Sequence, residues 1–164
     1  MTPKKAPHYF FETNQVWIGS DKGRVSIQHV DTELIVAPPV QFGGEAGHWS
    51  PEHLLLSAVS SCYMATLFAF AEKKKISING FDCQVIGQVE LVAGKFEFTH
   101  INVYPVIVVA DEALRTAAMM IAAQAERHCL VANSLDTDII YHTSVRTAAG
   151  SLQKKHGYLT AEDG

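Results

Sequence analysis

Three classes of protein are excluded by what this sequence lacks. It has only three cysteines in 164 residues, too few for a disulfide framework, and none stands in the C-x-x-C or C-x-x-H spacing of a zinc site. Its thirteen Lys and Arg residues are scattered except for the run Lys73 to Lys75, and the net charge is -4. No basic stripe is left for nucleic acid to bind. We therefore expect neither a metal nor a nucleic acid as a partner.

Long apolar runs are also missing. The segment "MTPKKAPHYFFETN" has no apolar stretch of signal-peptide length. The longest apolar stretch, Leu54 to Ala71, is interrupted by Ser and Thr side chains, which argues against a membrane partner. With 48% hydrophobic residues, the chain suits one globular domain. We expect a cytoplasmic protein with an N-terminal extension (1–14), one domain (15–146) and a C-terminal tail (147–164).

What is present is an alternation of strand and helix patterns. Apolar alternation on both sides of a Ser-Asp-Lys-Gly turn predicts a β-hairpin over 15–35, and the Pro- and Gly-rich residues 37–49 predict a loop. Two helices are expected, one ending near Lys74 and one that Asp111 caps. Strand patterns lie between them and after them, the last over 139–145. This order favours an α+β fold with a mostly antiparallel sheet.

The first of these helices has a well-defined start. Ser50 is suited to cap it, Pro51 suits its first position, and Glu52 lies where the helix dipole favours a carboxylate. Its middle is apolar on nearly every side, so we expect it to be central and largely buried. Because one small sheet covers only one side of such a helix, we expect a second subunit to cover the rest, in an intertwined homodimer.

Cys62 lies near the middle of this helix. A buried Cys usually fills space, whereas a Cys in a polar niche can be a nucleophile. Cys62 follows Glu52 by ten residues, which places the two side chains about 80° apart around the helix axis and about 15 Å apart along it. Cys129 ends the second helix, so only tertiary packing would bring it to Cys62. Cys83 stands in a strand pattern, where packing is its expected role.

Together these residues resemble a known family. The segment "FGGEAGHWSPEHLLLSAVSSC", followed by a helix that ends in Cys and then by "VANSL" and a strand, is similar to the OsmC/Ohr family of organic hydroperoxide reductases, over about 16–145. The resemblance implies an interlocked dimer with active sites at the subunit interface. There, Cys62 attacks the peroxide, Cys129 is the resolving cysteine and Glu52 is the active-site glutamate. No metal or organic cofactor is implied. The partners are an organic hydroperoxide and a dithiol reductant, such as a lipoyl or thioredoxin-like protein.

The family chemistry requires Cys62 to be a thiolate. A thiolate attacks the peroxide, the resulting sulfenic acid condenses with a second thiol, and an external dithiol restores both. An apolar helix interior raises the pKa of a thiol, so a cation is needed close by. The family takes it from the hairpin turn, where Arg24 is the only arginine and is able to pair with Glu52. By simple alignment the family arginine falls two or three residues earlier, so Lys22 is the alternative.

Two features separate this chain from the family pattern. The arginine is displaced, and Leu130 and Ala132 stand after Cys129 where family members commonly have Pro and then Ser. These differences motivate an alternative function, an OsmC-like dimer with little turnover that binds a small ligand or senses redox state. A metal site of His and Cys at the interface is a weaker third alternative, because the eight histidines share no common metal spacing.

Overall fold

The computed structural model describes residues 7–148. The chain divides between Leu55 and Leu56 into two compact units, called here the hairpin unit, up to Leu55, and the sheet unit, from Leu56. Helix α1 (Pro51–Lys74) begins in the first and continues through the second. The extension predicted for 1–14 lies outside the described residues in part, and the tail predicted for 147–164 lies outside them from residue 149 on.

The hairpin unit contains a three-stranded antiparallel sheet. Its strands, in order across the sheet, are β1 (Asn14–Gly19), β2 (Lys22–Ser26) and β3 (Leu34–Val36). The hairpin predicted for 15–35 is confirmed, although Gly23 stands inside β2 rather than in the turn. Residues 37–49 form the predicted loop, interrupted by one 3-10 turn, η1 (Val40–Phe42).

The sheet unit contains four strands, most of α1 and all of a second helix, α2. Their bounds are β4 (Ile78–Val92), β5 (Lys95–Val109), η2 (Glu112–Leu114), α2 (Arg115–His128), η3 (Ala132–Ser134), β6 (Asp138–Tyr141) and β7 (Ser144–Thr147). Strands β4 and β5 form a long antiparallel hairpin, and β6 and β7 follow one another along the other side of β5. Both are parallel to β5, because α2 carries the chain back to the end where β5 begins. The strand predicted over 139–145 is therefore two short strands.

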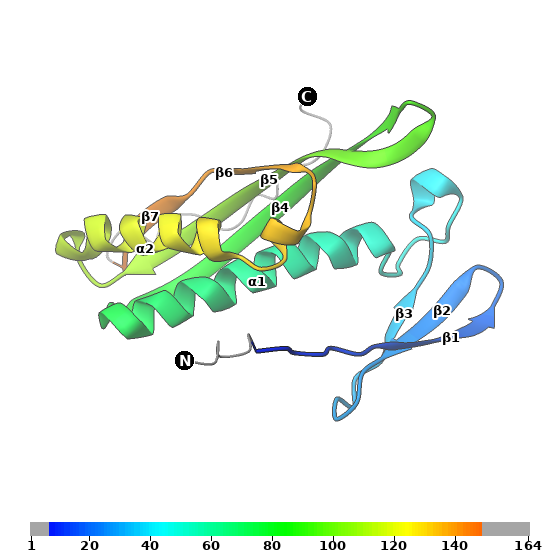
Figure 1. Cartoon of the computed structure of the whole chain (residues 1–164), viewed down its shortest axis with the longest axis horizontal. Coiled ribbons are helices and arrows are strands. Elements are labelled where there is room, and N and C mark those ends of the chain that lie inside the picture. The colour runs from blue at the N-terminus through cyan, green and yellow to red at the C-terminus, as the bar shows by residue number, and fades with distance from the viewer. Residues whose placement is uncertain (1–6, 149–164) are drawn as a thin grey trace, which may run out of the picture. The chain divides into compact units, whose positions relative to one another are not determined.

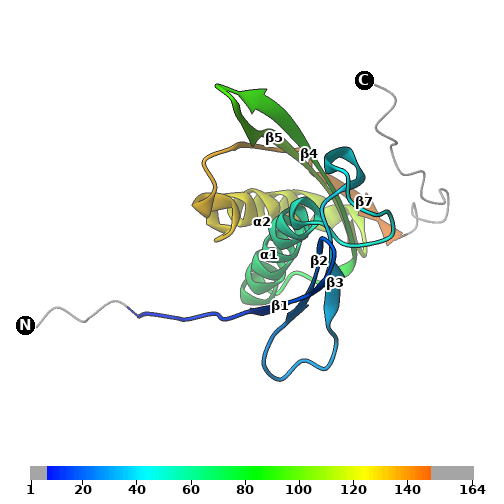
Figure 2. The same cartoon turned by 90° about the vertical axis from the view of Figure 1, so that its right-hand side faces the viewer.

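Both helices of the sheet unit pack on one face of its sheet (Figures 1 and 2). Strand β5 directs every second side chain from Ile101 to Val109 into this core, as a half-buried strand should. Helix α2 contributes a face of mostly small residues, namely Ala118, Ile121, Ala122 and Ala125. Helix α1 contributes Val59, Tyr63, Leu67 and Ala71. The core thus lies between one sheet face and one side of each helix.

Only one side of α1 is covered within a single chain. Its buried residues recur every fourth position, whereas Met64 is 39% and Phe68 41% exposed. The expectation of a largely buried helix is therefore not met in one subunit. By length and composition α1 is also the one helix within 7–148 apolar enough to cross a membrane, a test that the core helix of a soluble protein passes as well.

The two helix starts differ from one another. At α1 the prediction is confirmed, because the Ser50 hydroxyl accepts a hydrogen bond from the His53 backbone N–H at 3.3 Å. At α2 the prediction that Asp111 caps the helix is wrong. The chain first makes the 3-10 turn η2, the Asp111 side chain forms no cap hydrogen bond, and α2 begins only at Arg115.

Candidate redox site

Two free thiols meet inside the sheet unit. Cys62 lies on α1 and is half-buried, and Cys129 is the residue that ends α2 and is fully buried. Cys62 is close enough to Cys129 to act on the pKa of its thiol. The backbone N–H of Val131 donates to Cys62 Sγ at 3.4 Å, and the Cys129 thiol lies 4.0 Å from the carbonyl oxygen of Val59. Tertiary packing thus brings together two cysteines that are 67 residues apart (129 minus 62).

Burial keeps the Cys129 thiol protonated near neutral pH. It raises the pKa of Cys129 from its ordinary 9.0 to about 11, and the contact with Cys62 acts in the same direction. The backbone N–H groups of Ala132 and Val131 oppose part of this rise. Cys129 in this conformation is therefore a protected thiol that needs a proton acceptor before it can act as a nucleophile.

Cys83 behaves as the sequence predicts for a packing residue. It lies on β4 opposite Pro105, half-buried, beside the apolar cluster of Val59 and Ile101. Burial, followed by the charge of Asp82, raises the pKa of Cys83 to about 11. Burial therefore disfavours the thiolate of Cys83, as it does that of Cys129.

Two buried tyrosines share the core with the thiol pair. Tyr63 follows Cys62 on α1, Tyr141 ends β6, and their ring centroids are 5.3 Å apart. Both hydroxyls are buried without a hydrogen-bond partner among the described residues. Burial raises the pKa of Tyr63 to about 12 and raises that of Tyr141 further above its ordinary value. Sequence reasoning missed both residues, because a tyrosine in a core helix or strand gives no signal of chemistry.

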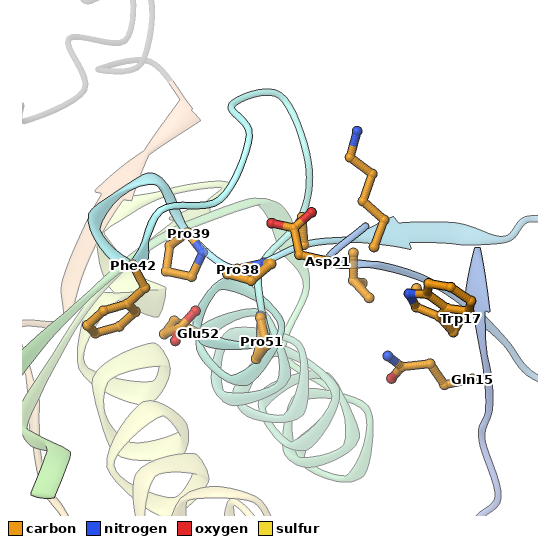
Figure 3. Close-up of a pocket in the computed structure, with 12 residues that line it drawn as sticks. Gln15, Trp17, Asp21, Pro38, Pro39, Phe42, Pro51 and Glu52 are labelled. Carbon is orange, nitrogen blue, oxygen red and sulfur yellow. The ribbon is translucent and has the colours of Figure 1, made fainter. Parts of the chain in front are cut away.

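The hairpin unit carries a cleft of about 620 Å³ at the start of α1 (Figure 3). Its lining residues are Gln15, Trp17, Asp21, Lys22, Gly23, Val36, Ala37, Pro38, Pro39, Phe42, Pro51 and Glu52. Figure 3 shows the Glu52 carboxylate between Phe42 and Pro51, with Trp17 and Gln15 toward the other end. A concave site with apolar walls and a few charged groups is typical of a small-molecule site.

The Gly-Gly pair follows η1 in the loop next to Phe42, a residue of this cleft. Gly43 ends η1 in the left-handed region at φ 83°, and a Cβ on Gly44 would lie 1.7 Å from the Pro38 carbonyl oxygen. Both positions therefore require glycine. The pair makes a tight turn that joins η1 to the rest of the loop.

Of the charged residues predicted for the active site, Glu52 and Lys22 line this cleft and Arg24 does not. Glu52 lines the cleft, and its Oε2 is buried without a hydrogen-bond partner in the described part of the chain. Arg24 does not line the cleft, because its Nε lies 3.4 Å from Glu33 in an ion pair. Lys22 does line it, and its ammonium pairs with Glu45, which lowers the pKa of that carboxyl. Of the two cations left open by the sequence, Lys22 is the one that shares the cleft with Glu52.

No group of three or more metal-ligating side chains is gathered within 7–148. His53 instead caps the helix start with Ser50, at 2.9 Å between its Nδ1 and the Ser50 hydroxyl, and His128 packs edge-on against Phe70. The described structure thus gives no support to the third alternative, a metal site.

A family model described as OsmC-like protein matches residues 43–143, more than half of the chain. The chain therefore belongs to the OsmC-like family. This match covers α1, the β4–β5 hairpin and α2, and it contains both thiols of the pair. Proteins named as organic hydroperoxide resistance proteins are among the solved structures that share this fold.

Solved structures share the fold at low sequence identity. An OsmC-like protein of unknown function from Vibrio cholerae is 15% identical with a TM-score of 0.76, covering 84% of this chain and 100% of that one. An organic hydroperoxide resistance protein from Elizabethkingia anophelis is 18% identical with a TM-score of 0.69, covering 87% and 99%. In sequence, the uncharacterized protein YmaD of Bacillus subtilis is 22% identical over 135 residues, covering 80% of this chain and 89% of that protein. The α+β, OsmC-like fold predicted from the sequence is confirmed.

Proposed function

We propose that this OsmC-like protein reduces organic hydroperoxides, with Cys62 as the attacking thiol and Cys129 as the resolving thiol. The contact between these two free thiols, one half-buried and one buried, is the observation that supports the proposal most directly. A disulfide between them needs little rearrangement when the thiols already touch. The membership of the chain in a family that includes hydroperoxide resistance proteins supports the same chemistry.

The proposed reaction has three steps. The Cys62 thiolate attacks one peroxide oxygen, the O–O bond breaks, and the alkoxide takes a proton to leave as an alcohol. Cys129 then attacks the sulfenic acid on Cys62, forming the S–S bond as the S–O bond breaks and water leaves. An external dithiol, such as a lipoyl or thioredoxin-like protein, exchanges with the disulfide and restores both thiols. No metal or organic cofactor takes part in this scheme.

We assign Glu52 and a cation of the hairpin unit to the stabilisation of the Cys62 thiolate. Arg24 is the cation to which the family resemblance points, whereas Lys22 lines the same cleft as Glu52. To reach Glu52, Arg24 would have to leave Glu33, and Lys22 would have to leave Glu45. Lys22 is the stronger candidate on the geometry of the hairpin unit, because it lines the cleft with Glu52 and Arg24 does not.

A homodimer is the assembly that we propose for this activity. The side of α1 that carries Met64 and Phe68 is open, and the hairpin unit exposes several aromatic side chains, namely Tyr9, Phe10, Phe11 and Trp17. Apolar patches of this kind mark association surfaces. A second copy covers them if the dimer is intertwined, and three free thiols fit the reducing conditions of the cytoplasm.

A thiol count after one turnover tests the peroxidase proposal. Reduced protein is mixed with one equivalent of cumene hydroperoxide, and we expect two thiols per chain to be lost. Cys62→Ser should abolish consumption of the peroxide, Cys129→Ser should leave a sulfenic acid that dimedone traps, and the control Cys83→Ser should behave as the parent. If Cys62→Ser consumes the peroxide as fast as the parent does, the proposal is wrong.

A second candidate function is favoured by the arrangement of the charges. Arg24 is held by Glu33 and no proline follows Cys129, which favours the binding of a small ligand or the sensing of redox state over turnover. The rate of Cys62 oxidation separates the two functions. Oxidation by cumene hydroperoxide no faster than that of free cysteine would favour the binding or sensing role.

A further inference from the structure

The thiol proposed to attack the peroxide has to ionise in a half-buried site on α1. Cys62 needs a group that stabilises its negative charge there. The two candidate cations of the hairpin unit, Lys22 and Arg24, are each paired with a carboxylate of the same unit. The sheet unit, which carries the thiol, supplies a donor of its own.

This donor is the backbone N–H of Val131, in the loop that follows α2 (129–134). It donates to Cys62 Sγ at 3.4 Å, and within residues 7–148 it is the one N–H that donates to this sulfur. A hydrogen bond to sulfur favours the thiolate over the neutral thiol, because the acceptor then carries a full negative charge. The contact is therefore stronger after ionisation than before it.

Packing of its own side chain holds Val131 in place. The side chain packs against both apolar clusters of the sheet unit, the one that contains Cys129 and the one that contains Val59. The preceding Leu130 is 67% exposed and does not anchor the loop in this way. The position of the N–H is thus set by the residue that carries it.

Asn133 ties the same loop to the end of α2. Its side-chain amide donates to the Arg127 carbonyl oxygen at 3.0 Å, and its backbone N–H donates to the Cys129 carbonyl oxygen at 3.0 Å. Both acceptors are carbonyl groups at the end of a helix, which lack partners within the helix. The loop is therefore held by hydrogen bonds where no proline follows Cys129.

We infer that the backbone N–H of Val131 stabilises the thiolate of Cys62 and that Asn133 positions this N–H. The inference rests on the proposed role of Cys62 as the attacking thiol. No proton is transferred, because the N–H stays intact while a sulfur lone pair forms the S–O bond to the peroxide. The hydrogen bond acts in addition to the charged groups of the hairpin unit.

The titratable side chains whose pKa values Cys62 affects do not supply this stabilisation. Burial raises the pKa of Cys129, at the end of α2, to about 11, and raises that of Tyr141, on β6, further above its ordinary value. Neither group carries a positive charge in any state. The Tyr141 hydroxyl also has no hydrogen-bond partner among the described residues. The Val131 N–H is thus the donor to Cys62 that the backbone fixes.

An amide-to-ester replacement removes the Val131 N–H and little else. Val131 is replaced by its α-hydroxy acid analogue in the full chain, and alkylation by iodoacetamide is followed on the Cys62 peptide by mass spectrometry. We expect roughly fivefold slower alkylation near neutral pH, because the thiolate fraction falls by more than the nucleophilicity of the thiolate rises. The matched control is the same replacement at Leu135, whose N–H donates to the Ala132 carbonyl oxygen at 3.2 Å.

The pH dependence separates stabilisation of the thiolate from a structural change. At about pH 10, above the ordinary thiol pKa, the Val131 ester should match or exceed the parent in brief incubations, because its thiolate forms without help and is the better nucleophile. Equal rates near neutral pH would overturn the inference. A deficit that persists at about pH 10 would overturn it as well, since it would indicate a distorted site.

Asn133→Ala tests the positioning role with an ordinary substitution. It removes the amide donor to the Arg127 carbonyl, and we expect a slowing of about twofold near neutral pH that disappears at about pH 10. Its control is Asn79→Ala, at the exposed start of β4. An Asn133→Ala variant that reacts as the parent does would refute the positioning role.

These results are distinguishable from those that test the peroxidase proposal. Iodoacetamide reports the thiolate of Cys62 without any peroxide, so equal rates for ester and parent would leave the proposed peroxidase activity intact. A parent that loses no thiols to cumene hydroperoxide would overturn that activity while leaving the measured effect of the Val131 N–H in place.

Discussion

The two units of the chain differ in how many of their side chains are buried. The sheet unit has a packed core of helix and strand residues, with the thiol pair and two tyrosines inside it. The hairpin unit buries few side chains, among them Val36 and Ser50, and exposes Trp17 to 73%. Its ion pairs are partly exposed as well. The thiols proposed to react therefore lie in a unit with a packed core of its own. The charged groups proposed to activate them belong to a unit that has little core.

The largest effect should come from the core of the sheet unit. Leu67 on α1 is fully buried, so Leu67→Ala should lower the free energy of unfolding by about 2–5 kcal/mol. The neighbouring Phe68 is 41% exposed in one chain, so Phe68→Ala should weaken dimer association more than it weakens the subunit core. Urea unfolding at several protein concentrations measures both. If both variants lost the same free energy of unfolding at every protein concentration, the two sides of α1 would contribute equally to the subunit core, contrary to this prediction.

The next effect concerns the carboxylate of the hairpin unit. Glu52→Gln keeps the shape of the side chain and removes its charge, and we expect a fall of roughly 100-fold in the rate of Cys62 oxidation, as for loss of a group that stabilises charge in a transition state. The control is Glu90→Gln, which changes an exposed carboxylate on β4. Stopped-flow consumption of cumene hydroperoxide gives both rates. A Glu52→Gln variant as fast as the parent would confine the role of Glu52 to the helix start.

A smaller effect should distinguish the two cations of β2. If Lys22 stabilises the thiolate, Lys22→Met should slow the alkylation of Cys62 by iodoacetamide roughly tenfold at neutral pH. Arg24→Met should leave the alkylation rate near that of the parent, because Arg24 is paired with Glu33. The reverse ranking of the two variants would assign the role to Arg24 and would show that its ion pair opens in solution.

The smallest effect is a change of stability at alkaline pH. The pKa of Cys129 is raised from 9.0 to about 11 in the folded chain, so the native state favours the protonated thiol. The stabilisation is complete below about pH 9 and is lost as the pH rises through about 11. Thermal unfolding from pH 8 to 11 should show a smaller decline for Cys129→Ala than for the parent. Parallel declines would mean that Cys129 ionises as readily in the folded as in the unfolded chain.

Local patterns were enough to predict most of the elements, whereas the pairing of Cys62 with Cys129 came from the family resemblance. The start of α1 depends on residues adjacent in the sequence, and the spacing from Glu52 to Cys62 is fixed by helix geometry. Both could therefore be predicted from the sequence. The parallel pairing of β6 and β7 with β5 could not be predicted, because it depends on where α2 packs. The partner of Arg24 also escaped prediction, since Glu33 is brought to it by the pairing of β2 with β3 and the loop between them.

The side chains around Cys129 show a further limit of sequence reasoning. Tyr63 and Tyr141 lie on α1 and β6, Cys129 ends α2, and each is unremarkable in its own segment. Their proximity arises only when the helices dock on the sheet. No spacing rule could have identified them, because the contacts join residues on three different elements.

The crossover through α2 has a consequence for the order of events during synthesis. Cys62 leaves the ribosome 67 residues (129 minus 62) before Cys129, and the two meet only after β5 has formed and α2 has returned along the sheet. Contacts between segments so far apart in sequence form late in folding, because loop closure must come first. The two thiols are therefore brought together only by the docking of α1 and α2 on the finished sheet, so their proximity is a property of the folded chain.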